Sequence, residues 1–295
     1  MNHKRSFDKN YLNQEFDKLN TKTKQSITLF LIGEGAMAFY GLKEATKDID
    51  IILTNTDDLE NLKTTLKAIG YKEPEPALIT RAYNYLQTNA ILENQDGFRW
   101  DLFLNKVCNA LTLSATMKQR ATQLYKGERL TVFVASKEDI FLFKGITERE
   151  TDLEDMRILA ESGLNWNIIN QECQNQSTST GRLWENALYQ KLTDLREKHH
   201  IEAPIEKTLR KRAEEKLIEI TLIEEIKKGN NTVNAISKSI NEPEHFVRES
   251  LNKLARKRLI KIDKTHRPHR YLLKTQTQKH ATGKQKATTR KTKRT

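Results

Sequence analysis

The sequence predicts an α+β protein in which a small β-sheet is followed by helices and then by a separate basic domain. Three observations predict this fold class. Strand-like and helix-like patterns alternate over residues 26–135, the pattern becomes helical over residues 136–204, and residues 205–274 follow the order helix, helix, turn, helix, β-hairpin. That last order is typical of a winged helix-turn-helix domain.

The positive charge of the 295-residue chain lies near its end. Lys and Arg number 51 and Asp and Glu 39, a net charge of +12, and residues 201–295 hold 25 basic and 11 acidic residues, so that segment carries +14 and residues 1–200 carry −2. Clustered positive charge attracts phosphates, so we expect a nucleic acid as partner, although anionic lipid would be attracted too. The 37% of hydrophobic residues excludes a fully disordered chain, and the composition is not that of a collagen.

Two cysteines, Cys108 and Cys173, lie far apart and outside any CxxC or His-rich pattern, so neither a disulfide framework nor a thiolate zinc site is indicated. The first ten residues are polar and charged, and no stretch approaches the roughly 20 apolar residues of a membrane span. We therefore expect a soluble, cytoplasmic protein without a signal peptide or a membrane partner.

Residues 1–25 are expected to form an N-terminal helix that packs on the first domain, because Phe7, Tyr11, Phe16 and Leu19 recur at near-helical spacing. The core of the domain follows over residues 26–135. Its apolar and β-branched runs predict strands, and the segments that end at glycine or polar turns predict helices. The expected strands are 26–33, 48–54, 98–104 and 130–136, and the expected helices are 36–42 and 57–69.

A helical extension of the core is expected over residues 136–204. Ser136 and Asp139 suit a cap at its first helix. Three helices are expected, at 136–161, 166–173 and 182–199, with a loop over 174–181.

The pair Asp48 and Asp50 is the most informative feature of the core. Side chains alternate along a strand, so both carboxylates lie on one face while Ile49 and Ile51 point to the other. Two close carboxylates repel each other, and a divalent cation that prefers oxygen ligands removes this conflict. The pair predicts a site for Mg²⁺ or Mn²⁺; the alternative is a strand end that exposes two solvated acids.

Asp101 belongs to a second strand pattern, in which Trp100 and Leu102 occupy the opposite face. If this strand lies beside the strand of Asp48 and Asp50, the third carboxylate can bind the same metal and orient an attacking hydroxyl, as in two-metal phosphoryl displacement. The alternative is an acid on an edge strand that faces water.

Gly33 and Gly35 fall between an apolar strand and a helix, where backbone amides can hold phosphates, although glycines at such turns often serve only steric needs. The segment LIGEGAMAFYGLKEATKDIDIIL, residues 31–53, resembles the first motif of the nucleotidyltransferase superfamily, which has the polymerase-beta-like fold with a small mixed β-sheet. In that motif a glycine turn precedes a pair of strand aspartates, and Tyr40-Gly41 and Thr46-Lys47 agree with it.

The resemblance implies a metal-dependent nucleotidyltransferase acting on an NTP. It assigns catalysis and metal binding to Asp48, Asp50 and Asp101, and nucleotide binding to Gly33 and Gly35. Glu34 departs from the motif, because many active members have Ser or Gly there and a carboxylate near a triphosphate is unfavourable. The residues thus leave open that nucleotide binding has been altered or lost.

The resemblance continues through residues 134–156, where Lys144, Asp152 and Asp155 are similar to a Lys and an aspartate pair of the abortive-infection toxin branch. By this likeness Lys144 contacts the triphosphate, and an antitoxin is a candidate partner. Taken alone, Lys144 either snorkels to the surface or meets a phosphate. Asp152 and Asp155 equally suit a solvated ion-pair network.

Basic residues gather on the last helix and the hairpin of residues 205–274. Contacts of such groups with phosphates would weaken steeply with salt, whereas a merely solvated helix face would bind nothing. Residues 275–295 contain no acidic or large apolar residue, which predicts a disordered basic tail. The expected nucleic-acid-binding residues are Arg248, Lys253, Arg256 and Lys257 on the helix and Lys264, Arg267 and Arg270 in the hairpin.

Two functions follow as hypotheses. The first is a metal-dependent nucleotidyltransferase that moves a nucleotidyl group from an NTP to a nucleic acid, such as tRNA, or to a protein. The second is a winged-helix DNA-binding regulator whose nucleotidyltransferase-like core has no turnover; Glu34 favours it and the three retained acids oppose it.

Overall fold

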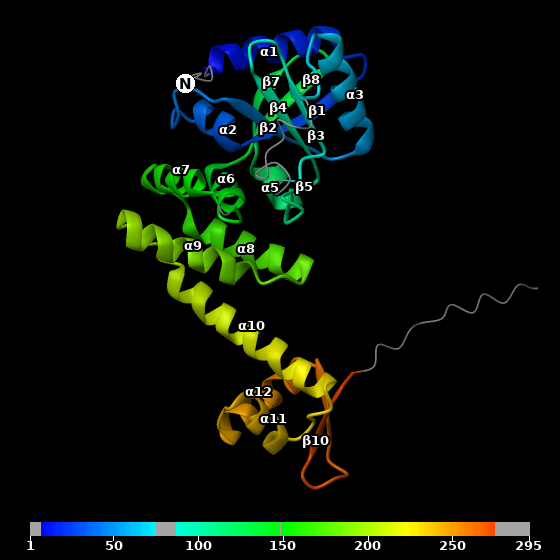
Figure 1. The fold of residues 1–295 in the computed structure, drawn as a ribbon, viewed down its shortest axis with the longest axis vertical. Helices are drawn as coiled ribbons and strands as arrows, with labels where there is room; N and C mark the ends of the chain where they lie inside the picture. The colour runs from blue at the N-terminus through cyan, green and yellow to red at the C-terminus, as the bar shows by residue number, and fades with distance from the viewer. Residues whose placement is uncertain (1–6, 75–86, 148, 275–295) are drawn as a thin grey trace, which may run out of the picture. The chain divides into compact units, whose positions relative to one another are not determined.

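The computed structural model describes residues 7–74, 87–147 and 149–274 and shows an α+β fold (Figure 1). The chain divides into two compact units, residues 1–213 and 214–295. The helices are α1 (Lys9–Lys22), α2 (Gly33–Phe39), α3 (Thr56–Ala68), α5 (Ala115–Arg120), α6 (Lys137–Lys144), α7 (Glu150–Glu161), α8 (Trp166–Thr180), α9 (Trp184–His199), α10 (Glu206–Lys227), α11 (Val233–Ile240) and α12 (Glu244–Arg256). The strands are β1 (Ile27–Ile32), β2 (Asp48–Leu53), β3 (Ala90–Glu93), β4 (Arg99–Leu104), β5 (Lys106–Val107), β6 (Leu111–Thr112), β7 (Thr122–Lys126), β8 (Leu130–Val134), β9 (Ile260–Asp263) and β10 (Arg270–Leu273).

A six-stranded mixed sheet forms the centre of the first unit, in the order β3-β4-β2-β1-β8-β7. β1 pairs antiparallel with β2 and parallel with β8, β2 pairs parallel with β4, and the outer strands β3 and β7 run antiparallel to their neighbours. The four strands expected from the sequence are the inner four, so the mixed α+β core is confirmed. The sequence did not predict the two edge strands, β3 and β7, because strands at an edge carry a weak apolar pattern. β7, for example, has no buried residue.

One face of the sheet packs against α1. The ring of Phe16 in α1 lies 6.2 Å from that of Trp100 in β4, and the neighbouring Ile49 and Ile51 of β2 are completely buried. The alternation of β2 and β4 therefore turns Asp48, Asp50 and Asp101 to the opposite face. Figure 1 shows the helices α6 to α9 gathered at one end of the sheet.

The single helix expected over residues 136–161 is wrong: the chain forms α6 and α7 with a break between them. Gly145 follows the last residue of α6, and its N–H donates to the carbonyl of Phe141 at 2.9 Å. The hydroxyl of Thr147 donates to the carbonyl of Lys144 at 3.0 Å, which competes with continuation of the helix.

The loop expected over residues 174–181 is also wrong, because α8 continues to Thr180 and ends at Gly181, whose φ is +68°. The amide of Gln176 donates to the carbonyl of Thr112 at 2.7 Å and accepts from the N–H of Thr112 at 3.2 Å. These bonds to the β6 strand offset the modest helix propensity of this polar segment.

The second unit contains the end of α10, the helices α11 and α12, and the antiparallel hairpin of β9 and β10. The hydroxyl of Thr232 caps α11, and the N–H of Tyr271 donates to the carbonyl of Asn231 at 2.7 Å. The helices and the hairpin expected here from the sequence are present. Their shared core consists of Leu222, Ile226, Ile236, Val247, Leu251, Leu254, Ile260 and Tyr271.

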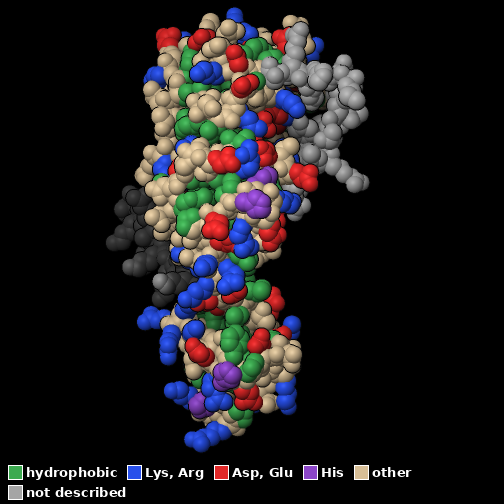
Figure 2. Space-filling model, turned by 90° about the vertical axis from the view of Figure 1, so that its left-hand side faces the viewer, with side chains coloured by type: hydrophobic (Ala, Val, Ile, Leu, Met, Phe, Trp, Pro, Cys, Tyr) green, Lys and Arg blue, Asp and Glu red, His purple; other side chains and the backbone are tan. Residues whose placement is uncertain are grey.

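Many Lys and Arg side chains lie on the surface of the second unit, at the lower end of the face in Figure 2. The expected disordered tail, residues 275–295, lies outside the described residues. None of the helices in the described ranges could span the apolar layer of a membrane.

Candidate active site

Three acids expected from the sequence are brought together on β2 and β4. The two strands are parallel and in register, so Asp50 lies opposite Asp101 and Asp48 lies opposite Arg99. Residues opposite each other in a sheet share a face, so all four side chains leave the sheet on the same side. The expectation that the strand of Asp101 lies beside that of Asp48 and Asp50 is confirmed, and β3 on its other flank excludes an edge position.

Arg99 joins two of these acids and was missed in the sequence. Its Nε donates to Oδ1 of Asp101 at 2.8 Å, its Nη2 reaches Oδ2 of Asp101 at 3.2 Å, and the same Nη2 donates to Asp48. Arg99 is 8% exposed and Asp101 is 1% exposed, so the pair is buried. Its position in the sequence could have indicated this role, because Arg99 stands two residues before Asp101 and hence on the same face of the strand.

Asp50 is the acid without such compensation. It has no ion pair or hydrogen bond to its side chain among residues 7–74, 87–147 and 149–274. Burial, followed by the charges of Asp48 and Asp101, raises the pKa of Asp50 well above its usual value. Burial also raises the pKa of Asp101, to about 6, against the opposing charge of Arg99. A cation at Asp50 would relieve this conflict.

The metal implied by the resemblance can be tested against these side chains. Carboxylate oxygens are suitable ligands for Mg²⁺ or Mn²⁺, and Asp50 with its neighbour Asp48, whose side chain is 26% exposed, fits a divalent cation. Both oxygens of Asp101 accept from Arg99, and Asp48 accepts from the same guanidinium. Within the described residues no three acidic, His or Cys side chains are grouped for a metal, so the role of Asp101 as a metal ligand stays a prediction.

Gly33 is required next to Asp50 for two reasons. Its φ is +66°, and a Cβ at this position would lie 1.9 Å from Oδ2 of Asp50. Gly35 differs, because the atom nearest to a Cβ at this position would be Cδ1 of Leu31, at 3.4 Å. The turn thus lets the backbone at Gly33 approach the Asp50 carboxylate closely, whereas Gly35 packs against β1.

Gly33→Ala is expected to lower the free energy of unfolding by about 1–3 kcal/mol, because alanine must adopt a left-handed conformation and displace the Asp50 carboxylate. Gly35→Ala, the matched control, is expected to change it by less than about 1 kcal/mol. Urea unfolding of the two variants measures both values. Equal losses would show that the Asp50 carboxylate does not limit the space at Gly33.

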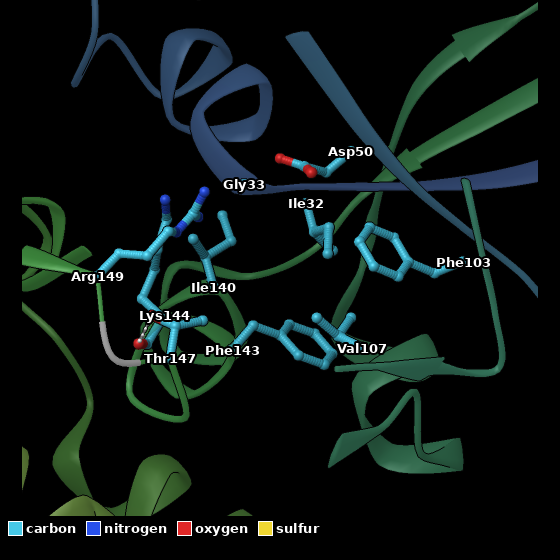
Figure 3. A pocket seen from close by; sticks show the side chains of 10 residues that line it. All are labelled: Ile32, Gly33, Asp50, Phe103, Val107, Ile140, Phe143, Lys144, Thr147 and Arg149. Atoms are coloured by element: carbon cyan, nitrogen blue, oxygen red, sulfur yellow. Dashed lines mark hydrogen bonds between the residues drawn. The ribbon is translucent and has the colours of Figure 1, made fainter. Parts of the chain in front are cut away.

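A pocket beside Asp50 brings the turn and the helical extension together (Figure 3). Asp50 and Gly33 lie on its sheet side, and Lys144 and Arg149 extend into it from the helical side. Its volume of about 30 Å³ leaves room for water-sized molecules and is far smaller than a whole nucleotide needs. The pocket is lined by Ile32, Gly33, Asp50, Phe103, Val107, Ile140, Phe143, Lys144, Thr147 and Arg149.

Lys144 does not snorkel to the surface: it is 5% exposed, and its Nζ lies 2.8 Å from Asp152 and 2.6 Å from Asp155. Both aspartates are 1% exposed, so the alternative of a solvated ion-pair network is wrong. Asp155 also pairs with Lys43 at 2.6 Å. Burial would lower the pKa of Lys144, but Asp152 and Asp155 outweigh it and raise that pKa.

Comparison with known proteins agrees with this geometry. A family model described as a nucleotidyltransferase of unknown function, DUF6036, matches residues 10–203, more than half of the chain. The chain belongs to this family. The match covers the sheet, the three acids and the helices α6 to α9, and it ends before the second unit.

Two solved structures are similar to this DUF6036 nucleotidyltransferase. A lincosamide antibiotic adenylyltransferase, LnuA, with bound lincomycin has 17% identity, covers 53% of this chain and 98% of its own, and has a TM-score of 0.37. A putative nucleotidyltransferase from H. pylori has 14% identity, covers 64% of this chain and 84% of its own, and has a TM-score of 0.33. No match was found among curated proteins.

Arg149 is a second residue of this nucleotidyltransferase that the sequence did not assign to the site. Its Nε and Nη2 bind the Asp152 carboxylate at 2.8 and 3.0 Å, while its side chain remains 43% exposed at the pocket. Burial would lower the pKa of Arg149, but Asp152 and then Asp50 raise it. Arg149 is therefore a fixed and accessible cation on the side of the pocket opposite Asp50.

The seven residues expected to bind nucleic acid are all exposed in the second unit. They fall on two elements. Arg248, Lys253 and Arg256 lie on α12 with Lys257 at its end, and Lys264, Arg267 and Arg270 lie in the hairpin.

Proposed function

We propose that this protein transfers a nucleotidyl group from an NTP to a nucleic-acid acceptor in a reaction that requires Mg²⁺ or Mn²⁺. One observation carries the proposal: Asp50 stands in register with Asp101 and against Gly33, and its carboxylate has no ion pair or hydrogen bond with a residue that the structure describes. A carboxylate that is buried without a direct partner costs stability, and sites of this kind persist where function requires them.

Asp48 and Asp50 would hold the divalent cation, which would neutralise charge on the triphosphate and the departing pyrophosphate. Arg149 is placed to bind the phosphates, since its accessible guanidinium is fixed by Asp152. Arg99 positions Asp48 and Asp101 by bonding to both.

Asp101 would orient the acceptor hydroxyl and take its proton, because a carboxyl with a pKa of about 6 is mostly ionised at neutral pH. The hydroxyl oxygen then bonds to the α-phosphorus, the bond from that phosphorus to the bridging oxygen breaks, and pyrophosphate leaves with the electron pair. Gly33 keeps the backbone close to Asp50 during this displacement.

The second unit favours nucleic acid as the acceptor. Its order of two helices, a third helix and an antiparallel hairpin supports a winged-helix domain, and residues 201–295 carry +14. Glu34 in the first turn of α2 favours the second candidate, a DNA-binding regulator without turnover, because its carboxylate would repel a triphosphate.

Label transfer tests the proposal directly. We expect purified protein with each labelled NTP, Mg²⁺ and total cellular RNA to label an RNA species, and a chelator to abolish the label. Nucleotide binding is measured in parallel by calorimetry. Absence of both label and metal-dependent NTP binding would contradict transfer and favour the regulator, whereas binding with label on protein would change the acceptor.

A further inference from the structure

The basic charge of the second unit is unevenly divided between α12 and the hairpin. Residues 241–257, which contain α12, hold four basic and three acidic residues, a net charge of +1. Residues 258–274, which contain β9 and β10, hold six basic and one acidic residue, a net charge of +5. Two segments of equal length thus differ by four charges, and the larger charge lies on the hairpin.

The cations of α12 are largely compensated by carboxylates. Arg248 lies 3.6 Å from Glu244, Lys253 lies 3.5 Å from Glu249, and Lys257 pairs with Glu219 of α10. These are exposed pairs of small energetic value, but each places a negative charge where a phosphate would have to lie.

The outward face of α12 is mixed in charge as well. Val247, Leu251 and Leu254 are buried and fix which face points inward. Glu249 follows Val247 by two residues and lies on the opposite, exposed face. A surface hollow along the helix is lined by Glu244, His245, Arg248, Glu249 and Asn252, so two of its five residues are acidic.

The hairpin has the opposite character. Lys261, Lys264, Arg267 and Arg270 are all exposed, and none of them forms an ion pair with a residue that the structure describes. The one acid of the hairpin, Asp263, accepts from the N–H of Thr265 at 2.9 Å and lies 3.1 Å from His266.

The framework of the hairpin is anchored to the core of the unit. Ile260 and Tyr271 are buried, and Ile262 lies opposite Tyr271 in the strand register. Lys261 and Arg270 therefore point to the other face of the hairpin. In Figure 2 Lys and Arg side chains, in blue, project from the second unit at the bottom of the view, where Figure 1 draws the loop of the hairpin.

We propose that nucleic acid binds the second unit through the β9–β10 hairpin, by contacts of Lys261, Lys264, Arg267 and Arg270 with phosphates, and not through α12. This inference rests on the proposed nucleic-acid acceptor and specifies the surface that holds it. Contacts of this kind position a nucleic acid without reading its bases, so binding is independent of sequence and strongly dependent on salt.

Two charge-matched variants of the full chain test the assignment. The hairpin variant carries Lys261→Gln, Lys264→Gln, Arg267→Gln and Arg270→Gln; the helix variant carries Arg248→Gln, Lys253→Gln, Arg256→Gln and Lys257→Gln. Each removes four positive charges from exposed positions, and residues 275–295 are the same in both. Affinity for a short mixed-sequence DNA duplex and the matching RNA duplex is measured over a range of salt, with circular dichroism and thermal unfolding as controls of folding.

The hairpin variant is expected to lose about 3 to 4 from the magnitude of the slope of log affinity against log salt, because each phosphate contact contributes about 0.9. The helix variant is expected to lose less than about 1. A larger loss in the helix variant would overturn the proposal in favour of α12, and equal losses would show a diffuse effect of net charge.

Failure of this inference is separable from failure of the proposed function. If the wild-type chain binds a duplex and the hairpin variant binds it equally well, only the surface assigned here is overturned. If the hairpin variant loses binding to phosphatidylserine vesicles but still binds the duplex, the hairpin binds an anionic membrane surface instead. No wild-type binding to any nucleic acid would overturn the acceptor as well, while NTP binding by the first unit is measured independently.

Discussion

Asp50→Asn is expected to abolish nucleotidyl transfer while making the folded protein more stable. The substitution keeps the shape of the side chain and removes a negative charge that is held against Asp48 and Asp101, without a partner among the described residues. Transfer should fall by at least about 1,000-fold, because a metal ligand contributes several kcal/mol to the transition state. The free energy of unfolding, measured without metal, should rise by about 1 kcal/mol.

Asp57→Asn is the matched control, since Asp57 is an exposed acid of α3 outside the pocket. It is expected to retain activity and to change stability by less than about 0.5 kcal/mol. Label transfer in Mg²⁺ measures the activity of both variants, and urea unfolding in a chelating buffer measures their stability. An Asp50→Asn protein that is less stable than wild type would mean that the Asp50 carboxylate is compensated in the fold.

The alternation of residues 48–51 was sufficient to predict which face of the strand carries the acids. Ile49 and Ile51 are completely buried, as strand geometry requires, and the acids point the other way. The sequence could not place Asp101 beside Asp50, because strand pairing between segments about 50 residues apart depends on the whole sheet.

Arg99 shows what sequence patterns leave open. Its position two residues before Asp101 fixes the face, but whether it also pairs with Asp48 depends on the register that puts the two residues opposite each other. The register between β2 and β4 is defined only in the assembled sheet. The bonds of Arg99 to Asp101 join two residues of one strand and do not depend on this register.

The break between α6 and α7 was hidden for a related reason. Helical periodicity continues through Gly145 and Thr147, so the sequence predicted one helix. The break places Arg149 at the pocket and turns Asp152 and Asp155 back onto Lys144. Residue spacing along a continuous helix could not have predicted these contacts.

Lys144→Met is expected to lower the free energy of unfolding by about 3 kcal/mol, because it leaves Asp152 and Asp155 short of a buried positive charge. Lys43 still pairs with Asp155 and Arg149 with Asp152, which keeps the loss at the lower end of the range for broken buried pairs. Urea unfolding measures the loss.

A double-mutant cycle separates the ion pair from packing. Asp155→Asn alone should also destabilise, and Lys144→Met with Asp155→Asn should cost at least about 1 kcal/mol less than the sum of the single changes. Arg157→Met, on the same helix as Asp155, is the control, because its pairs with Glu154 and Glu161 are exposed and should contribute little.

If Lys144→Met leaves stability unchanged and instead weakens NTP binding, the Lys144 ammonium binds the triphosphate, as the resemblance implies. The expected loss of stability with no coupling to NTP would leave Arg149 as the cation that meets the nucleotide.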